Sequence, residues 1–398
     1  KSDQVPVVAS SSQGTSKDYP DAVQAQRSPG ATTEPERSSQ ASFPDEYGKF
    51  IKVVYYNKTS TVQLYEKKAA ATEPISSPTK SRRNSMFTKL RRASMPKATI
   101  RELYAVKVFH ETKPDSRQVL LSRDRSGDSP LSHPNILSII EVLYNKQGNL
   151  CLVMPFCIGG NLHTFLQREA RAKEYLPVEE VDCLGVQILR AVGFLHEWGI
   201  AHGDLRPEHV LLTGRSAIKV SGFGEDEDAV RKLVRLLNHG SSTSSPSGLK
   251  PGEVAESNSK PLLCIHRGVS EPSTPYLPPE RFSSRRDSVR QGYTHQHIYD
   301  IRAGDIWACG MIYMLLRAGE LPWRSAQRID PKKSYSEYLH SRLKEDGYGP
   351  IQALEMHCRN VVYAMLHPDP GLRITAEEIL RSEWALSTSV CEIGEKGL

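Results

Sequence analysis

The order of the periodic segments along the chain constrains its fold more than any other feature of the sequence. Short runs rich in β-branched and aromatic residues come first and predict strands. These runs are 50–56, 60–65, 103–109, 136–144 and 150–154, with a short pair at 210–212 and 218–220. Segments with apolar residues at steps of three or four predict helices at 178–199, 304–317, 350–366 and 376–381. Strands followed by helices predict an α+β fold, with an N-terminal antiparallel β lobe and a mainly helical C-terminal lobe.

Four segments lack the apolar residues that a folded core needs. Residues 1–42 contain no Leu, Ile, Met, Phe or Trp, so burial does not offset the entropy of ordering them, and we expect a disordered tail. Residues 66–101 are rich in Ala, Ser, Pro and basic side chains, which indicates a basic disordered insertion between two strands. A Ser/Gly/Pro-rich loop follows at 239–260, and residues 387–398 are expected to form a C-terminal tail.

The composition argues against several classes of protein. No run of about 18 apolar residues exists, so we expect no transmembrane helix. A net charge of +6 does not indicate a nucleic-acid-binding protein. The seven cysteines form no Cys-x-x-Cys pair, which favours reduced thiols over a disulfide framework or a zinc site. The first residues lack the apolar core of a signal peptide, so we expect a cytoplasmic protein.

Residues 201–212, with the sequence Ala-His-Gly-Asp-Leu-Arg-Pro-Glu-His-Val-Leu-Leu, resemble the catalytic loop of eukaryotic protein kinases. Further segments resemble motifs of that family in the same order, at 105–107, 133–136, 154–162, 218–224, 275–280, 305–310 and 370–375. The resemblance implies a bilobal protein-kinase-like domain over 43–386, whose β lobe carries one helix. It makes 66–101 an insertion in the N-lobe and 239–270 an insertion in the activation segment.

The resemblance assigns the nucleotide site to residues of the β lobe and the hinge. Lys107 would contact the α- and β-phosphates of ATP, with Met154, Phe156 and Cys157 beside the nucleotide. In the family, the lysine also pairs with an acidic residue of a helix, for which Asp124 is the candidate here. A lysine that only stabilises the fold through a salt bridge is the alternative.

Asp204 stands where the family has its catalytic base, and Arg206 replaces the lysine near the γ-phosphate. An aspartate that only organises its loop is the alternative for Asp204. The other matched residues imply structural roles, and in the family such an arginine usually pairs with such a glutamate. They are His202, Glu280, Asp305 and Arg373.

The positions of the metal ligands depart most from the family. Its two magnesium ligands, an Asn and the Asp of Asp-Phe-Gly, are replaced here by His209 and Gly222. Magnesium demands hard oxygen ligands, which neither side chain supplies. Residues 54–62, which match the glycine-rich loop, contain no glycine, and Gly203 replaces the arginine that reads activation-loop phosphate. We therefore expect a pseudokinase without a firm metal site, with ATP as the candidate cofactor and magnesium poorly held.

Other interpretations stay open from the sequence. The four acids at 225–228 are a candidate replacement for the magnesium ligands, with a solvated acidic turn as the alternative. The retained Lys107 and Asp204 favour an active, atypical Ser/Thr kinase. Residues 74–101 carry eight basic side chains and no acid, which favours a binding module recruited to an anionic membrane surface, with a solvated insertion as the alternative.

Three serines each follow a pair of arginines and suit a basophilic kinase that acts on this chain, since an acidic pocket can pair both arginines. They are Ser85, Ser94 and Ser288. The residues around Ser94 also resemble a phosphoserine-adaptor site of the 14-3-3 type, with Arg three residues before and Pro two after. Phosphate on Ser85 and Ser94 would weaken binding to an anionic membrane, which gives an electrostatic switch.

The segments 305–313, 373–376 and 382–384 are most similar to the fungal halotolerance and nitrogen-permease-reactivator Ser/Thr kinases. That family regulates nutrient and cation transporters of the plasma membrane. The resemblance therefore implies proteins as partners, namely an active kinase, a transporter or an adaptor, and a peripheral location at the plasma membrane.

Overall fold

The computed structural model describes residues 47–68, 101–110, 132–172, 176–222, 263–264, 275–282, 300–327 and 335–397. Several predictions lie outside the described residues. They are the tail at 1–42, nearly all of the insertions at 66–101 and 239–270, Asp124, the acids at 225–228, and Ser85, Ser94 and Ser288. All other residues assigned to the site from the sequence are described.

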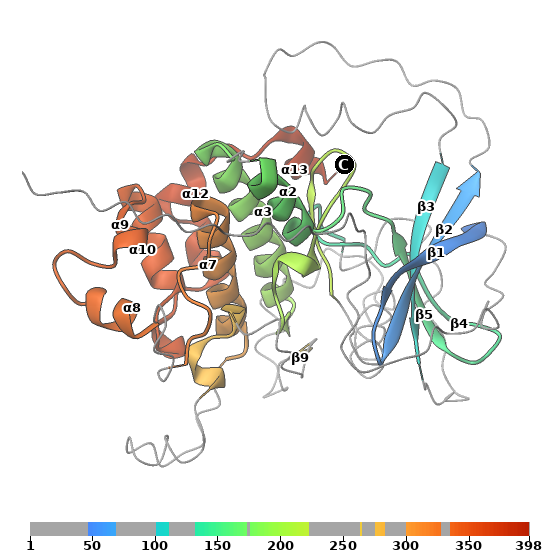
Figure 1. Cartoon of the computed structure of the whole chain (residues 1–398), viewed down its shortest axis with the longest axis horizontal. Coiled ribbons are helices and arrows are strands. Elements are labelled where there is room, and N and C mark those ends of the chain that lie inside the picture. Colours follow the sequence, from blue (N-terminus) through green and yellow to red (C-terminus); the bar gives the residue numbers. More distant parts are fainter. Residues whose placement is uncertain are drawn as a thin grey trace, which may run out of the picture. The chain divides into compact units, whose positions relative to one another are not determined.

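An antiparallel sheet of five strands forms the N-terminal part of the described chain (Figure 1). In sheet order, its strands are β1 (Lys49–Tyr56), β2 (Ser60–Lys68), β3 (Arg101–Phe109), β5 (Leu150–Pro155) and β4 (Glu141–Tyr144). Every neighbouring pair in the sheet is antiparallel. The antiparallel sheet and the helices that follow it confirm the α+β fold predicted from the order of the periodic segments.

Two strands differ from their predicted bounds. β2 continues through Lys68, so it runs into the segment predicted as an insertion. The strand predicted over 136–144 begins only at Glu141. The earlier residues of that segment leave the sheet, because Ile136 forms an isolated parallel bridge with Val220 of the catalytic region.

The register of β3 against β5 decides which side chains share a face of the sheet. Ala105 pairs with Met154, and Lys107 pairs with Leu152. Directly opposed residues point to the same face, so these four side chains lie together. The other face is apolar and closely packed, with a buried cluster of Tyr47, Tyr65, Val106, Val108, Leu143, Cys151 and Val153.

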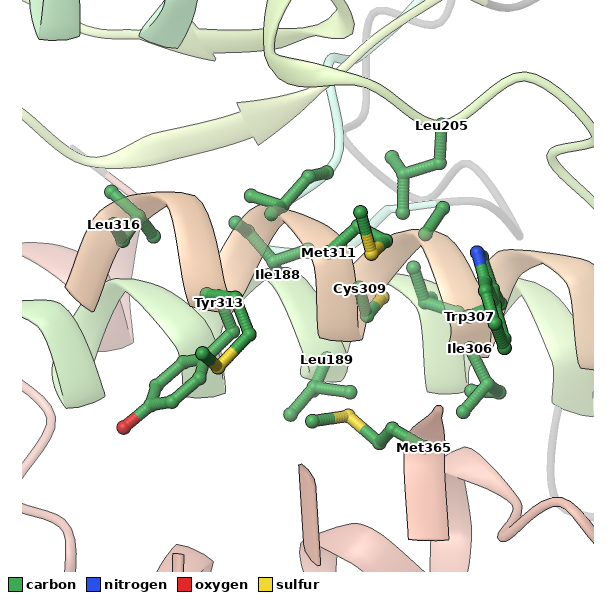
Figure 2. Close-up of a cluster of buried hydrophobic side chains, with 14 of the residues drawn as sticks. Ile188, Leu189, Leu205, Ile306, Trp307, Cys309, Met311, Tyr313, Leu316 and Met365 are labelled. Carbon is green, nitrogen blue, oxygen red and sulfur yellow. The ribbon is translucent and has the colours of Figure 1, made fainter. Parts of the chain in front are cut away.

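Helices form most of the C-terminal part (Figure 1). They are α2 (Leu162–Ala172), α3 (Val178–Glu197), α7 (Arg302–Ala318), α8 (Tyr335–Ser341), α9 (Gly349–Gln352), α10 (Met356–Met365), α11 (Ala376–Leu380), α12 (Glu383–Ser387) and α13 (Glu392–Lys396). Figure 2 shows the centre of their core, where Leu189 of α3, Met311 of α7 and Met365 of α10 lie together. The core also holds Leu205, so the catalytic loop is anchored to it by an apolar side chain.

The helical part differs from the sequence prediction at several places. The single helix predicted over 350–366 is two helices, because Leu354 turns into the core and Glu355 has an extended backbone, with φ −60° and ψ 151°. α2, α8 and α12 have no counterpart in the prediction. The segment at 387–398, predicted as a tail, contains α13, whose Gly394 is buried against the helical core.

Short elements position the catalytic loop. It lies between β6 (Ile200–Ala201) and β7 (Val210–Leu212), with a 3-10 turn at Pro207–His209. β7 pairs with β8 (Ile218–Val220) in the predicted hairpin, and β6 pairs in parallel with β9 (Leu263–Cys264). In the described ranges, no helix has both the length and the apolar character needed to cross a membrane.

Candidate functional site

Asp305, in the first turn of α7, holds the start of the catalytic loop. Its carboxylate is buried and accepts the backbone N–H groups of His202 and Gly203, both at 2.8 Å. The His196 Nε2 atom lies 2.9 Å from the same carboxylate. Gly203 has φ +81°, a left-handed conformation that costs other residues free energy. Asp305 therefore fixes the loop through its backbone, and the glycine suits the turn.

Asp204 is the carboxylate of the loop and is only 5% exposed. Its Oδ2 atom lies 3.4 Å from Arg206 Nε and 3.8 Å from His209 Nδ1. The backbone N–H of Asp204 donates to His202 Nδ1 at 3.3 Å, and His202 Nε2–H donates to the Ser221 carbonyl at 2.7 Å. The structure thus brings together the loop residues that the sequence selected, around one buried aspartate.

His209 lies beside Gly222, and the two residues fit each other. The His209 Nδ1–H donates to the Asp204 carbonyl at 2.8 Å, which fixes the ring against the loop. Its ring also stacks on the ring of His202, with the ring centroids 5.7 Å apart. A Cβ atom on Gly222 would lie 3.0 Å from the His209 ring, and Gly222 has φ +97°. The imidazole therefore occupies the space next to a position that favours glycine.

These residues do not fit a magnesium ion. Gly222 has no side-chain ligand atom, and an imidazole such as that of His209 suits magnesium poorly. The remaining carboxylate, that of Asp204, already faces Arg206 and His209. Within the described ranges, no group of three or more His, Cys, Asp and Glu side chains is arranged to hold a metal ion. The chemistry of the ligand positions, rather than any geometry alone, disfavours magnesium here.

The nucleotide-site candidates lie on β3 and β5 and just after β5. Lys107 Nζ lies 5.0 Å from the centre of the Phe109 ring, on the sheet face that Met154 shares. The Phe156 N–H donates to the Leu103 carbonyl at 3.0 Å and so ties the hinge to β3. The Cys157 thiol is buried, and burial raises its pKa to about 11. The four candidates therefore lie near one another on the sheet and at the hinge, and their contact with a nucleotide stays a prediction.

The turn between β1 and β2 matches the glycine-rich loop. In this turn, a side chain accepts hydrogen bonds from the backbone N–H groups. Asn57 Oδ1 accepts the backbone N–H groups of Thr59 at 3.0 Å and Ser60 at 2.7 Å. His110 lies against this turn, with Nε2 2.7 Å from Thr61 Oγ1. In a glycine-rich loop such N–H groups face phosphate, but here a side chain binds them. The sequence predicts a turn at Asn57, but it did not reveal that the Asn57 side chain binds these two N–H groups.

A buried ion pair ties the end of the activation segment to the helical core. Arg373 donates to both carboxylate oxygens of Glu280, at 2.8 and 3.0 Å. It also donates to the carbonyls of Ala303 and His367, and its guanidinium lies over the Trp307 ring. The arginine side chain is 0% exposed. The pair is therefore structural and lies outside the phosphate chemistry.

A small open hollow lies beside the catalytic loop. Gly203, Asp204, Tyr276, Pro278 and Arg281 are among the residues that line it. The hollow therefore reaches the catalytic loop at Asp204, the residue that matches the family's catalytic base.

A model of the protein kinase domain family matches residues 93–243. The serine/threonine-protein kinase hal4 of Schizosaccharomyces pombe is 35% identical over 300 residues, covering 74% of this chain and 40% of that protein. HAL4/SAT4 of Saccharomyces cerevisiae is 34% identical over 297 residues, covering 74% and 42%. A probable HAL5-like kinase of Vanderwaltozyma polyspora is 25% identical over 360 residues, covering 88% and 42%. The chain thus spans about two fifths of the length of these curated relatives.

Proposed function

The chain belongs to the eukaryotic protein kinase family. Within that family, we propose that it is a pseudokinase. On this proposal, the protein keeps the kinase scaffold and regulates other proteins by binding them rather than by transferring phosphate. Its relatives named above are serine/threonine kinases, so the proposal separates this chain from them by the chemistry of its site.

The contact between His209 and Gly222 is the observation that carries the proposal. Phosphoryl transfer depends on positioning and on neutralising phosphate charge, which the metal ions largely do. Replacement of the Asn and Asp ligands by His209 and Gly222 removes both oxygen donors. The His209 ring then fills the space that a longer side chain at 222 would need. The metal ions stabilise the transition state by several kcal/mol, and loss of this stabilisation corresponds to a decrease of about 10³-fold or more in rate.

The turn between β1 and β2 supports the proposal independently. Two of its backbone N–H groups donate to Asn57 Oδ1, so they are not directed at a phosphate. The side chains of this turn are also larger than glycine and crowd the approach of a nucleotide. ATP binding is therefore expected to be weak, and independent of magnesium where it occurs.

An active, atypical serine/threonine kinase is the second candidate, and specific residues favour it. Lys107 and Asp204 are both present, and an open hollow lies beside Asp204. The expected partners, namely an active kinase, a transporter, a phosphoserine adaptor at Ser94 or an anionic membrane surface, stay predictions. The membrane-recruited module depends on the basic segment at 74–101, which lies outside the described residues.

Nucleotide binding and phosphate transfer, measured together, test the proposal. We expect about 1 mM ATP with magnesium to leave the melting temperature of the purified chain nearly unchanged, because stabilisation requires a ligand concentration well above Kd. We expect transfer to a serine peptide with two preceding arginines to stay at the level of the Asp204→Ala variant.

The same assay distinguishes the two candidates. Transfer by the wild-type protein that disappears in both Lys107→Ala and Asp204→Ala would overturn the pseudokinase proposal and support an atypical kinase. Transfer that persists in both variants would point to a contaminating kinase, which an added inhibitor of conventional kinases would remove. Arg302→Ala, which changes an exposed ion pair with Asp300, serves as the control for unrelated loss of charge.

A further inference from the structure

Two cysteines that are 208 residues apart in the chain meet between α3 and the start of α13. Cys183 lies in α3 and is 4% exposed, whereas Cys391, just before α13, is exposed. The backbone N–H of Cys391 donates to Cys183 Sγ at 3.4 Å. The Gly394 N–H donates to Cys391 Sγ at 3.3 Å, so that sulfur lies at the same junction. The sulfur atoms are thus neighbours, one buried and one accessible.

The surroundings of this pair prepare the exposed sulfur for reaction. The neighbouring thiol of Cys183 lowers the pKa of Cys391 to about 6, with further help from the Gly394 N–H. The interaction with Cys391, together with burial, raises the pKa of Cys183. By contrast, burial raises the pKa of Cys151 to about 12. An exposed thiolate next to a buried thiol is the arrangement of an attacking and a resolving cysteine.

The segment that follows Cys391 packs on a buried polar cluster of the helical core. The Gly394 carbonyl accepts a hydrogen bond from Asn135 Nδ2 at 3.2 Å, and the Glu395 carboxylate pairs with Arg190 of α3 at 2.7 Å. Gly394 lies directly against Gln187 of α3, where a Cβ would be only 2.5 Å from the Gln187 side chain. A covalent link at Cys391 would therefore fix α13 onto α3 and onto the turn before β4.

We propose that Cys183 and Cys391 form a reversible disulfide that fastens α13 to α3 when the protein meets a hydroperoxide. The Cys391 thiolate attacks one peroxide oxygen, the O–O bond breaks, and hydroxide leaves as Cys391 becomes a sulfenic acid. The Cys183 sulfur then attacks the Cys391 sulfur, the S–O bond breaks, and water leaves with the proton of the Cys183 thiol. Two thiols and one hydrogen peroxide thus give one disulfide and two waters. A dithiol restores the pair by exchange.

Mapping of non-reduced peptides from the full chain tests this assignment. After treatment with hydrogen peroxide, mass spectrometry is expected to find a peptide that joins Cys183 to Cys391 and that dithiothreitol removes. The melting temperature of the oxidised protein should rise by roughly 5 °C, since the link closes a long loop. Sulfinic acid at Cys391 without the link, a link to Cys264 instead, or no oxidation would each overturn the proposal.

Two variants separate the pair from a general effect of thiols. Cys391→Ser keeps an oxygen that accepts the Gly394 N–H, and it should remove both the link and the rise in melting temperature. Cys358→Ser changes a buried thiol elsewhere in the helical core, and it should leave the link intact. In the reduced wild type, iodoacetamide should modify Cys391 at least about tenfold faster than it modifies the buried cysteines, which are Cys151, Cys157, Cys183, Cys309 and Cys358. Equal rates would contradict the proposal even if a variant failed to fold.

Discussion

The anchor of the catalytic loop and the metal positions both serve that loop, yet only the anchor is kept. Asp305 forms hydrogen bonds to the backbone of His202 and Gly203. His209, at the end of the loop, and Gly222, after β8, lack the oxygen ligands that the family has at these positions. The Asp305 carboxylate accepts backbone N–H groups of the loop, and these groups need an acceptor whether or not the loop is catalytic. Loss of Asp305 would therefore disrupt the folding of the loop. The metal ligands matter only for phosphate chemistry, and their loss leaves the fold intact.

The largest expected effect concerns the scaffold side of this comparison. Arg373→Met removes the partner of the buried Glu280 carboxylate and leaves four acceptor atoms of the core without their donor. We expect the free energy of unfolding to fall by about 3–5 kcal/mol, measured by urea denaturation. Arg381→Ala, in an exposed pair with Glu377, is the control and should cost less than about 0.5 kcal/mol. Equal losses of stability in the two variants would show that the buried ion pair contributes no more to the fold than an exposed one.

A smaller effect is expected at the metal positions, where the two replacements should depend on each other. Gly222→Asp alone places a Cβ 3.0 Å from the His209 ring at a φ of +97°. We expect it to lower the free energy of unfolding by about 1–3 kcal/mol. Combined with His209→Asn, the cost should shrink, because the smaller amide leaves space beside residue 222. A double-mutant cycle measures this coupling.

The same double variant tests whether the protein lacks only the metal ligands or also lacks a nucleotide site. With both oxygen ligands restored, magnesium should raise the melting temperature in the presence of ATP, whereas neither single variant should respond. A response of the wild-type protein to magnesium and ATP equal to that of the double variant would contradict the interpretation that these positions no longer hold the metal.

A further expected effect on the scaffold side is a pH dependence of stability. Burial, with the nearby positive charges of Lys219 and Arg190, lowers the pKa of His133 to about 4. His133 Nδ1 also accepts the Asn135 N–H at 3.1 Å, which requires a neutral ring. Since the unfolded chain protonates at a pKa of about 6.5, this contribution is complete above pH 6.5 and is lost as the pH falls toward 4. His133→Asn keeps an acceptor for the same N–H without titrating.

Unfolding curves between pH 7 and pH 4 test this expectation. The wild-type protein should lose more stability over that range than His133→Asn does. Parallel curves for the two proteins would contradict this expectation, because they would show that the pKa of His133 is the same in the folded and unfolded states.

Local patterns predicted the sheet and the long helices well, for two different reasons. The strand pair over 50–56 and 60–65 was predicted from its β-branched and aromatic residues, although β1 is exposed along nearly its whole length. The helix at 178–199 was predicted from the spacing of its apolar residues, which are buried. α2 was missed because only Leu162 and Phe165 are buried, which is too weak a period to detect. The break between α9 and α10 depends on Leu354 entering a core assembled from distant helices, and no local signal marks it.

The residues of the site were accessible from the sequence only through motif spacing, and their contacts were not. The resemblance placed His209 and Gly222 at the ligand positions, but it did not reveal that the ring of one fills the space beside the other. The meeting of Cys183 with Cys391 also depends on α13 packing onto α3, in a segment whose composition predicted a tail. Contacts between segments this far apart require the assembled core.

The anchor at Asp305 also sets an order in time. The loop residue Gly203 lies 102 residues before the carboxylate that holds its N–H. At about 5–20 residues per second, a ribosome needs roughly 5–20 s to add that much chain. During synthesis the loop therefore exists for seconds without the aspartate that shapes it, and it can take its final form only after α7 has emerged.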